Sequence, residues 1–599
     1  MAADTIPHRL LARARELGGN CPAVHTKQGD RWVPKSWAAY ADEIRRAAKG
    51  LMALGVGHGD RICLLGFNAP EWAMLDLAAM MIGAVPAGIY TTCSAEEVRY
   101  ILTHAEAKVC LVETRAHWEK VLGARDALPE LVAVTMIAAP ELEDEGGTTL
   151  TWGQLLARGA DVPDSDLDAR LDALKDDDHA TFIYTSGTTG PPKAVILTHG
   201  NLAWTAGAAI RLNATTADDS SLSYLPLSHI AEKMFTVLAP ATCGSQVYFA
   251  TSFDKVADEL REVQPTLVFG VPRVWEKMYL GVSSRLAEAP QPRKAIAEWA
   301  MGVGRRVVAR RNRGEALSLR ERAAYRLARR LVFSRLRPLM GLGRVTVCVS
   351  GAAPIAREVL EFFSGLDLVV QEVYGQSEDC GPTTFNRPGA TKFGTVGLPL
   401  EGTEVRIADD GEILVKGPHV FAGYFKDPEG TAEVLRDGWL HSGDLGAFDS
   451  DGFLTITGRK KEILITAGGK NIAPANIEAA LKGVPMVSQA VVIGDRRPYL
   501  VALLALDPPA AEAFAKEHGL AVADVPASEA LRAVLQQGID NEVNPRFAQV
   551  EHVRKFAVLP RELSIEGGEL TPTMKVKRKV VDEHFADEIE ALYASGRSA

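Results

Sequence analysis

A polar loop carries the clearest chemical signal in the chain. Residues 184–199 read YTSGTTGPPKAVILTH. The nine residues from 185 to 193 offer hydroxyl groups, glycines that let backbone N–H groups approach a ligand closely, and one fixed positive charge. These groups belong to Thr185, Ser186, Gly187, Thr188, Thr189 and Lys193. Hydroxyls and bare N–H groups hydrogen-bond phosphate oxygens, and lysine supplies a point charge. The loop therefore predicts a polyphosphate site.

The loop differs from the common phosphate-binding loop. A Walker A motif needs glycine, four residues and then Gly-Lys-Ser/Thr, whereas Gly187 is followed here by Gly190 and only then by Pro191-Pro192-Lys193. The β-branched and aromatic runs 181–183 and 194–197 predict a short strand on each side. A different nucleotide fold is implied, although composition alone also fits a flexible Gly/Thr-rich turn.

The loop resembles the phosphate-binding signature of the AMP-forming adenylating enzymes. This superfamily includes acyl-CoA synthetases, firefly luciferase and the adenylation domains of peptide synthetases. Ala194 departs from the usual pattern, in which glycine follows the lysine. The resemblance runs through seven ordered segments over essentially the whole chain. Segments 66–72, 89–92, 470–471 and 573–575 are similar to the long-chain and very-long-chain ("bubblegum") branch of acyl-CoA synthetases.

Length and patterning predict more than one domain. A chain of 599 residues with 47% apolar content exceeds what one hydrophobic core usually serves. Helix and strand patterns alternate up to about residue 180, which is typical of a layered α/β domain. A charged run at 458–462 between apolar runs predicts a linker. We expect a large α/β adenylation and acyl-binding domain at 1–458, a hinge at 459–462 and, as the resemblance implies, a small mobile α/β domain at 463–599.

Charge and cysteine usage exclude several classes. A net charge of −10 argues against nucleic-acid binding as the main task. Seven scattered cysteines without a CxxC pair predict neither a disulfide framework nor a zinc site. The N-terminus lacks the features of a signal peptide, and the most apolar stretch, 74–90, is too short to span a bilayer. We expect a cytoplasmic protein in which 74–90 is a buried helix passing into a strand.

Two segments combine small residues with an aromatic ring. Ser350-Gly351-Ala352 follows the strand-like run 345–349, and residues 372–378, which read EVYGQSE, follow the run 366–370. By residue type alone, an ordinary strand-to-loop turn and a binding segment fit both stretches equally well. The resemblance implies an adenine pocket, in which small residues admit a flat purine. Its members are Gly351, Ala352, Tyr374, Gly375 and Ser377. The resemblance also assigns Mg²⁺ to Glu378, and one carboxylate that shares the metal with phosphate oxygens is sufficient.

Three later segments are weak signals by themselves. Residues 442–444 read as a Ser-Gly-Asp turn, 466–471 as a glycine loop and 570–579 as a solvated basic tail. A helix from Pro474 to Leu481 is expected after the glycine loop. The resemblance implies that Asp444 accepts hydrogen bonds from the ribose hydroxyls, that Arg459 also contacts the ribose, and that Lys461 is the hinge. It further implies that Gly468 and Gly469 let the pantetheine of CoA pass, and that Lys575 reaches into the adenylation site.

A histidine stands at the end of the apolar run 224–229. Such a histidine is more often a packing residue than a functional one. The resemblance instead makes His229 a substrate-orienting residue where the acyl carboxylate and the adenylate meet. His229 and Lys575 are therefore the expected catalytic residues.

An arginine-rich stretch has two interpretations. Twelve arginines and only two glutamates lie between Arg305 and Arg337. Leu319, Ala323, Leu327 and Leu331 recur every four residues, which predicts a basic amphipathic helix. An ordinary solvated face is the favoured interpretation, and peripheral contact with anionic lipid headgroups is the other.

The resemblance implies a two-step reaction on small-molecule substrates. A fatty carboxylate attacks the α-phosphorus of Mg·ATP and displaces pyrophosphate, and the thiol of coenzyme A then captures the acyl-adenylate. A fatty acyl-AMP ligase that serves a carrier protein shares the first step. A peptide-synthetase module would need a carrier domain, for which the residues up to Ala599 leave no room. The non-enzyme alternative is an adenylate-binding regulator or membrane-associated scaffold. No GxSxG elbow supports a serine hydrolase. Residue types predict neither chain-length preference nor oligomeric state.

Overall fold

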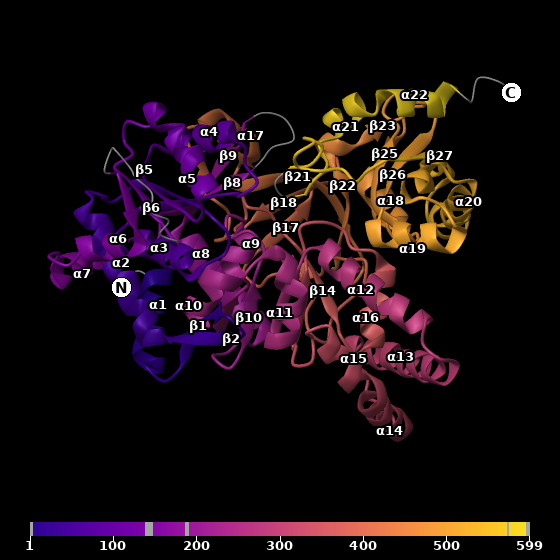
Figure 1. Cartoon of the computed structure of the whole chain (residues 1–599), viewed down its shortest axis with the longest axis horizontal. Coiled ribbons are helices and arrows are strands. Elements are labelled where there is room, and N and C mark those ends of the chain that lie inside the picture. Colours follow the sequence, from indigo (N-terminus) through magenta and orange to yellow (C-terminus); the bar gives the residue numbers. More distant parts are fainter. Residues whose placement is uncertain (1–3, 138–147, 186–190, 572–573, 595–599) are drawn as a thin grey trace. The chain divides into compact units, whose positions relative to one another are not determined.

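The chain forms two compact units (Figure 1). The computed structural model describes residues 4–137, 148–185, 191–571 and 574–594. The first unit comprises residues up to Ala352, Glu361–Arg406 and Leu414–His441, and the second comprises Ala353–Leu360, Ile407–Ile413 and residues from Ser442 onward. Both units combine helices with sheets, so the predicted α/β fold class is confirmed.

An eight-stranded sheet of the first unit contains the two strands predicted around the phosphate loop. β8 (His179–Thr185) and β9 (Lys193–Thr198) are antiparallel neighbours. From β8 onward the neighbouring strands run parallel. The full order is β19 (Gly423–Tyr424), β9, β8, β4 (Val85–Ile89), β3 (Arg61–Leu65), β5 (Ala107–Val112), β6 (Ala133–Met136) and β7 (Thr149–Thr151).

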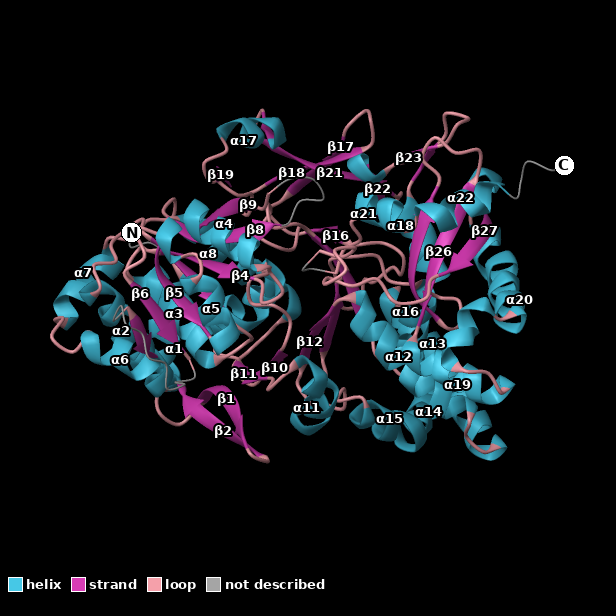
Figure 2. Ribbon diagram, turned by 45° about the horizontal axis from the view of Figure 1, so that its top comes forward, coloured by secondary structure: helices cyan, strands magenta, loops and turns pink. Residues whose placement is uncertain are grey.

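Buried helices support this sheet. α3 (Pro70–Met81) and α5 (Arg115–Leu122) lie beside its strands (Figure 2). Every residue of α3 except Glu71 is buried, and the chain then enters β4, which confirms the buried helix and strand predicted over 74–90. The amphipathic α2 (Trp37–Ala53) packs on α3. None of the helices that the structure describes combines the length and the apolarity needed to cross a membrane.

A nine-stranded sheet forms the rest of the framework of the first unit. Its central strands run parallel, and the strands at both edges are antiparallel. The order is β16 (Leu398–Pro399), β15 (Thr384–Phe385), β14 (Val370–Tyr374), β13 (Val347–Ser350), β12 (Leu267–Gly270), β10 (Ser220–Ser223), β11 (Gln246–Phe249), β1 (Pro22–Gln28) and β2 (Arg31–Ser36). The carboxyl ends of parallel strands are where α/β sheets bind ligands. Gly351 and Gly375 directly follow two such ends.

A buried ion pair links three elements of the first unit. Lys233 ends the short helix α9 (Ile230–Lys233). Its Nζ donates hydrogen bonds to Asp76 Oδ1 of α3 and to Thr181 Oγ1 of β8, each at 2.7 Å. The Lys233 and Asp76 side chains are 1% and 0% exposed. Since a buried charge is costly without its partner, the pair holds α9 against the strand that leads into the phosphate loop.

The second unit contains a three-stranded sheet with one apolar cluster on each face. β26 (Leu500–Leu506) lies between β25 (Val487–Ile493) and β27 (Val553–Val558), and all seven of its residues are buried. Successive strand residues point to opposite faces. Leu500, Ala502 and Leu504 pack in a cluster with residues of α18 (Pro474–Leu481), α19 (Pro508–His518) and α20 (Glu529–Gly538). Val501, Leu503 and Ala505 pack with residues of α21 (Arg578–His584) and α22 (Ala586–Ala594). The helix predicted from Pro474 to Leu481 is confirmed.

Two local predictions are wrong. β14 begins only at Val370, after α16 (Arg357–Gly365) and a bend in which Asp367 has a φ of 59°, so most of 366–370 lies outside the strand. Residues 442–444 are part of β21 (Trp439–Phe448), not a separate turn. The strand accommodates Gly443 at a φ of 72°, a backbone conformation that glycine adopts without steric cost.

The arginine-rich stretch is several helices, whereas one was predicted. α13 (Gln291–Asn312) ends before Gly314, whose φ is 69°. α14 (Leu319–Ala328) then begins with a capping box between Ser318 and Glu321. A π-helical turn over Arg329–Phe333 leads into α15 (Ser334–Leu339). The glycine and the new N-cap interrupt the helix, which the four-residue spacing alone did not reveal.

The buried ion pair makes a prediction about stability. We expect Lys233→Met to lower the free energy of unfolding by about 3–5 kcal/mol, because the Asp76 carboxyl group would remain buried without the ion-pair partner that offsets the cost of its burial. The double variant Lys233→Met/Asp76→Leu should recover much of this loss. Chemical denaturation measures both effects. Arg115→Met is the matched control, because its partner Glu119 and Arg115 itself are more than half exposed, and it should cost at most about 1 kcal/mol. Equal losses in the Lys233 and Arg115 variants would contradict the structural role.

Candidate nucleotide and acyl-transfer site

The ends of the predicted phosphate loop are held together by strand pairing. Thr185 ends β8, Lys193 begins β9, and the two residues are opposite each other in the antiparallel register. Thr185 Oγ1 donates a hydrogen bond of 3.4 Å to the Lys193 carbonyl oxygen. The loop residues Ser186, Gly187, Thr188 and Thr189 lie outside the described residues. The strand pair therefore fixes where the loop starts and where its lysine emerges.

Lys193 lies against Tyr424 of β19 and against Asp427, which follows this strand. Its Nζ is 2.7 Å from Asp427 Oδ2 and 4.7 Å from the centre of the Tyr424 ring. The ion pair with Lys193 lowers the pKa of Asp427, so this carboxylate stays ionised at neutral pH. A Cβ at Gly430 would lie 2.4 Å from Lys193 Nζ, so glycine leaves room for the ammonium group. The lysine is half-exposed and its charge faces solvent on one side.

Tyr424 joins Lys193 to the predicted metal ligand. The Tyr424 hydroxyl donates a hydrogen bond of 2.8 Å to Glu378 Oε1, while the ring contacts the lysine. The backbone N–H of Phe421 donates to the Glu378 carbonyl oxygen at 2.8 Å, which fixes the main chain there. One tyrosine therefore places an ammonium and a carboxylate next to each other. A cation and a hard oxygen ligand are the two groups that a metal-bound polyphosphate requires.

The predicted adenine pocket lies at the carboxyl ends of β13 and β14. Gly351 is buried, and a Cβ there would lie 2.7 Å from Val373 Cγ1. A Cβ at Gly375 would lie 1.4 Å from the Gly381 carbonyl oxygen, so no other residue fits. Ala352 has a φ of 71°, an uncommon conformation for a residue with a side chain, and one that is often found at functional sites. The backbone is therefore closely packed at the carboxyl ends of β13 and β14.

The two other predicted residues of this pocket are buried. Tyr374 ends β14, and its ring is 8% exposed. Ser377 is equally buried, and its carbonyl oxygen accepts a hydrogen bond of 3.1 Å from the Cys380 N–H. Gly351, Tyr374, Gly375, Ser377 and Glu378 all lie in the first unit, as do Lys193 and His229. The structure thus brings Glu378 to Lys193 and places the small residues at neighbouring strand ends.

His229 precedes α9 as its N-cap. Its Nδ1 accepts a hydrogen bond of 3.1 Å from the Ala231 N–H, so Nδ1 carries no proton and Nε2 carries one. Glu232, three residues later, is buried and accepts hydrogen bonds from the Tyr224 N–H and the Thr236 hydroxyl. Burial raises the pKa of Glu232 to about 7. The helix behind His229 is therefore held by two buried ionisable side chains, Glu232 and Lys233.

The second unit contains the predicted ribose-binding pair. Asp444 in β21 and Arg459 in β22 (Leu454–Arg459) are opposite each other in antiparallel register. Arg459 Nε lies 3.1 Å from Asp444 Oδ1. The arginine fixes the orientation of a mostly buried carboxylate, and an oriented carboxylate suits a diol. Lys461 follows in an exposed 3₁₀ turn over Lys460–Glu462.

The predicted glycine loop is a tight exposed turn. It joins β23 (Leu464–Ile465) to β24 (Asn471–Ile472). The Thr466 N–H donates to the Lys470 carbonyl oxygen at 3.0 Å, and the Gly469 N–H donates to the Thr466 carbonyl oxygen at 2.8 Å. Gly468 and Gly469 are exposed, and Gly469 has a φ of 72°. The turn thus presents bare backbone to solvent.

Lys575 lies at the end of another turn of the second unit. Leu570 and Val576 form an antiparallel bridge across its base. The Lys575 N–H donates to Thr571 Oγ1 at 3.0 Å, and the Thr571 N–H donates to the Lys575 carbonyl oxygen at 2.8 Å. Met574, at a φ of 63°, completes the turn. The backbone is therefore fixed at Thr571, while the Lys575 side chain is exposed.

Two family models match almost the whole chain. The model described as "AMP-binding enzyme" matches residues 12–425, and the model described as "AMP-binding enzyme C-terminal domain" matches residues 461–597. Long-chain-fatty-acid–CoA ligase ACSBG2 of Xenopus laevis is 39% identical over 98% of this chain and 83% of its own length. The chain belongs to the AMP-binding enzyme family. Long-chain-fatty-acid–CoA ligase FadD15 of Mycobacterium tuberculosis is 40% identical over 94% of this chain and 92% of its own.

Solved structures share the fold of this AMP-binding enzyme. The A-PCP didomain of carboxylic acid reductase from Segniliparus rugosus, in complex with AMP, superimposes with a TM-score of 0.76 at 22% identity, covering 99% of this chain and 82% of that chain. ATP-bound MatB from Rhodopseudomonas palustris gives 0.70 at 23% identity, with 98% and 99% covered. At these identities the likeness establishes the fold.

Several residues at the site of this AMP-binding enzyme escaped the sequence analysis. Tyr424 and Asp427 contact the predicted ligands but lie more than 40 residues from Glu378 and more than 200 from Lys193. No local sequence pattern identifies these two residues as part of the site. Glu232 and Lys233 could have been identified from the sequence, because two ionisable residues stand in an otherwise apolar run next to His229. Buried charges of this kind need partners, which makes them worth singling out.

The position of Tyr424 makes a prediction about nucleotide binding. We expect Tyr424→Phe to weaken binding of Mg·ATP by about tenfold, because a hydrogen bond to a charged group contributes about 1.5–3 kcal/mol. Isothermal titration calorimetry measures the change.

Tyr325→Phe is the matched control for this variant. It also removes a tyrosine hydrogen bond to a carboxylate, from Tyr325 to Asp367 Oδ2 at 2.5 Å, but in α14. This control should leave ATP affinity unchanged. Equal loss of affinity in the two variants, or none in Tyr424→Phe, would contradict the placement of Glu378 by Tyr424.

Proposed function

We propose that this protein is an AMP-forming long-chain fatty acid–CoA ligase. The observation that carries the proposal is the identity of 34–40% to proteins named long-chain-fatty-acid–CoA ligase over at least 94% of this chain. The contact of Lys193 and Glu378 through Tyr424 supports it, because activation of a carboxylate by ATP needs both groups. The substrates are a fatty acid, ATP and CoA, and the products are acyl-CoA, AMP and pyrophosphate.

In the first step, an oxygen of the fatty carboxylate attacks the α-phosphorus of ATP and the bond to pyrophosphate breaks. Lys193 and the hydroxyls of Thr185, Ser186, Thr188 and Thr189 hold the phosphates, with Gly187 in the same loop. Glu378 holds Mg²⁺, which neutralises charge on the phosphates when bound. The single carboxylate fits this metal, since Mg²⁺ usually takes its other ligands from phosphates and water. Catalysis of a phosphoryl-group reaction of this kind depends on alignment of the reacting atoms and on neutralisation of the phosphate charge.

The remaining residues orient the two substrates. Tyr374 stacks on the adenine, beside Gly351, Ala352, Gly375 and Ser377, while Asp444 and Arg459 hold the ribose. With Nδ1 engaged by the Ala231 N–H, His229 offers its Nε2–H to the acyl carboxylate. This hydrogen bond orients the nucleophilic oxygen and removes no proton. Lys575 neutralises negative charge between carboxylate and α-phosphate, and its exposed position at a turn with a fixed backbone suits this role.

In the second step, the CoA sulfur attacks the carbonyl carbon of the acyl-adenylate and AMP leaves. We propose that Lys461 is the hinge within 459–462 between a domain at 1–458 and a mobile domain at 463–599. The C-terminal family model begins at residue 461, which supports a boundary there. Rotation about the hinge withdraws Lys575 and presents Gly468 and Gly469, whose exposed backbone leaves space for pantetheine.

The fatty acyl-AMP ligase alternative finds no support in the names of the relatives. Cytoplasmic placement is part of the proposal. All seven cysteines, five of which are buried, are free thiols, as expected in a reducing compartment.

Measuring the two half-reactions separately distinguishes the proposed role of Lys575 in adenylation from a role in thioester formation. We expect Lys575→Ala to slow acyl-adenylate formation by about 10²–10³-fold, by analogy with removal of one donor to a developing charge. Thioester formation from supplied acyl-AMP should stay within a few-fold of the unaltered enzyme. Pyrophosphate release measures the first half-reaction, and chromatography of acyl-CoA measures the second.

Lys579→Ala provides the control. Lys579 is nearby in the sequence and almost fully exposed. The Lys579→Ala variant should therefore leave the rates of both half-reactions unchanged. Equal loss of both half-reactions in Lys575→Ala would exclude a role confined to adenylation.

A further inference from the structure

The segment from α14 to α15 is apolar on two opposite sides. Ala328, Val332 and Phe333 are buried against the body of the first unit, which is the expected packing. Leu319, Leu327 and Leu331 are 82%, 49% and 38% exposed. Since residues four apart lie on one face of a helix, these leucines and the exposed Ala323 form a stripe that faces solvent. Packing within the first unit does not explain the stripe.

We define the α14 face as this stripe together with the arginines around it. Arg322, Arg326, Arg329 and Arg330 are exposed and interleaved with the leucines. α14 packs on α13, and both are joined to α15 at one end of the first unit (Figure 1).

Most arginines of this region have no acidic partner. The two local glutamates, Glu315 and Glu321, are within ion-pair distance of Arg310 or Arg313. Arg311 and Arg337 lie near Asp367. Within the described parts of the chain, no carboxylate is within 4 Å of the other arginines, which are Arg305, Arg306, Arg320, Arg322, Arg326, Arg329, Arg330 and Arg335. The protein carries a net charge of −10, so this local excess of positive charge is an exception.

We propose that the α14 face docks on an anionic lipid surface. The helix lies in the plane of the interface, the leucines enter the boundary between headgroups and acyl chains, and the arginines bind lipid phosphates. Charge complementarity and exposed apolar area both point to this partner. A nucleic acid would match the arginines but would leave the leucines in contact with water and phosphate. Docking does not require the proposed ligase function, although a membrane is where long-chain fatty acids accumulate.

Vesicle sedimentation with the full chain tests the proposal. The native protein should bind vesicles of phosphatidylglycerol and phosphatidylcholine, bind pure phosphatidylcholine much more weakly, and dissociate partly at high salt. We expect Arg326→Glu/Arg329→Glu/Arg330→Glu to bind the anionic vesicles about a hundredfold more weakly, since each basic residue near the surface contributes a roughly fivefold gain in affinity. Leu319→Ser/Leu327→Ser/Leu331→Ser should also bind less well, and its residual binding should be more sensitive to salt.

A charge-matched control separates the α14 face from net charge. Arg15→Glu/Arg46→Glu/Arg99→Glu changes the net charge equally, on exposed arginines of α1 (Ile6–Leu17), α2 and α4 (Ala95–Ala105), and should retain vesicle binding. All variants change exposed side chains, and circular dichroism melting should confirm that they fold. Absence of native binding to anionic vesicles, or equal loss in the control triple, would overturn the proposal. Binding of the native protein and the α14 variants to duplex DNA, and their self-association, should be measured as well. The proposal would also be overturned if the α14 variants bound vesicles normally and lost only binding to duplex DNA or only self-association.

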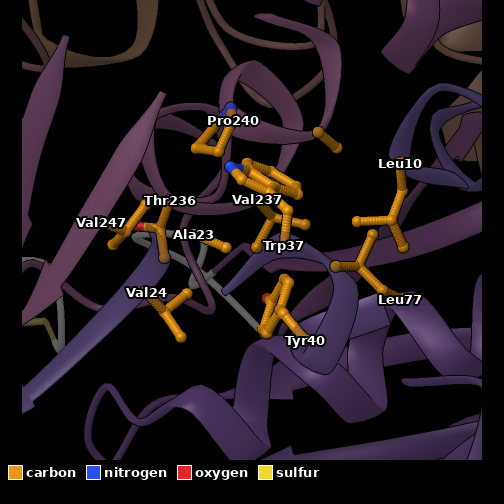
Figure 3. A pocket seen from close by; sticks show the side chains of 11 residues that line it. Leu10, Ala23, Val24, Trp37, Tyr40, Leu77, Thr236, Val237, Pro240 and Val247 are labelled. Carbon is orange, nitrogen blue, oxygen red and sulfur yellow. The ribbon is translucent and has the colours of Figure 1, made fainter. Parts of the chain in front are cut away.

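One small cavity among the described residues of the first unit offers no comparable site. The pocket between α1, β1, α2 and the helical turn at 234–238 is lined mainly by apolar side chains, among them Leu10, Trp37 and Val237 (Figure 3). It has room for about one water molecule. A space of this size belongs to the packing of the first unit.

Discussion

The contact of one tyrosine with both a cation and a carboxylate is the constraint on which the nucleotide site depends. Lys193 supplies the cation and Glu378 the carboxylate, and the two residues are far apart in the sequence. Tyr424 holds both, through its ring and its hydroxyl, and β19 is itself paired with β9, the strand that begins at Lys193. The same strand pairing that builds the sheet therefore helps to position Lys193, the proposed phosphate-binding residue, and Glu378, the proposed metal ligand, around Tyr424.

A second constraint lies beneath the first. The phosphate loop emerges from β8, and β8 is tied through Thr181 to Lys233, which follows His229 by four residues. A buried ammonium cannot shift without losing Asp76 as well, so the histidine and the start of the loop are held in one rigid arrangement. The second unit is built differently. Lys575, Gly468 and Gly469 lie on exposed turns whose bases are fixed by hydrogen bonds, which suits the proposed movement of these residues into and out of a site.

Much of this arrangement could be predicted from local residue patterns. The β-branched runs predicted β8 and β9, and a proline followed by an apolar helical pattern predicted α18. Contacts made across long separations could not be predicted. Lys233 and Asp76 are 157 residues apart, and Lys193 and Asp427 are 234 apart, so no local pattern links them. The prediction of a single helix for the arginine-rich stretch failed for another reason: the four-residue spacing runs only from Leu319 to Leu331, and it carries no information on Gly314 and the Ser318 cap, which separate α13 from α14. The roles of the matched site residues came from the family resemblance and remain proposals.

The central claim is that one protein activates a fatty acid with ATP and then transfers it to CoA. Pyrophosphate release with purified protein, Mg·ATP and free fatty acids from short to very long, with and without CoA, tests it most directly. Without CoA, the account predicts about one pyrophosphate per protein molecule, because the adenylate stays bound. With CoA, it predicts continuous release matched by acyl-CoA, fastest for long chains. No release with any fatty acid, or release with CoA that yields no acyl-CoA, would contradict it.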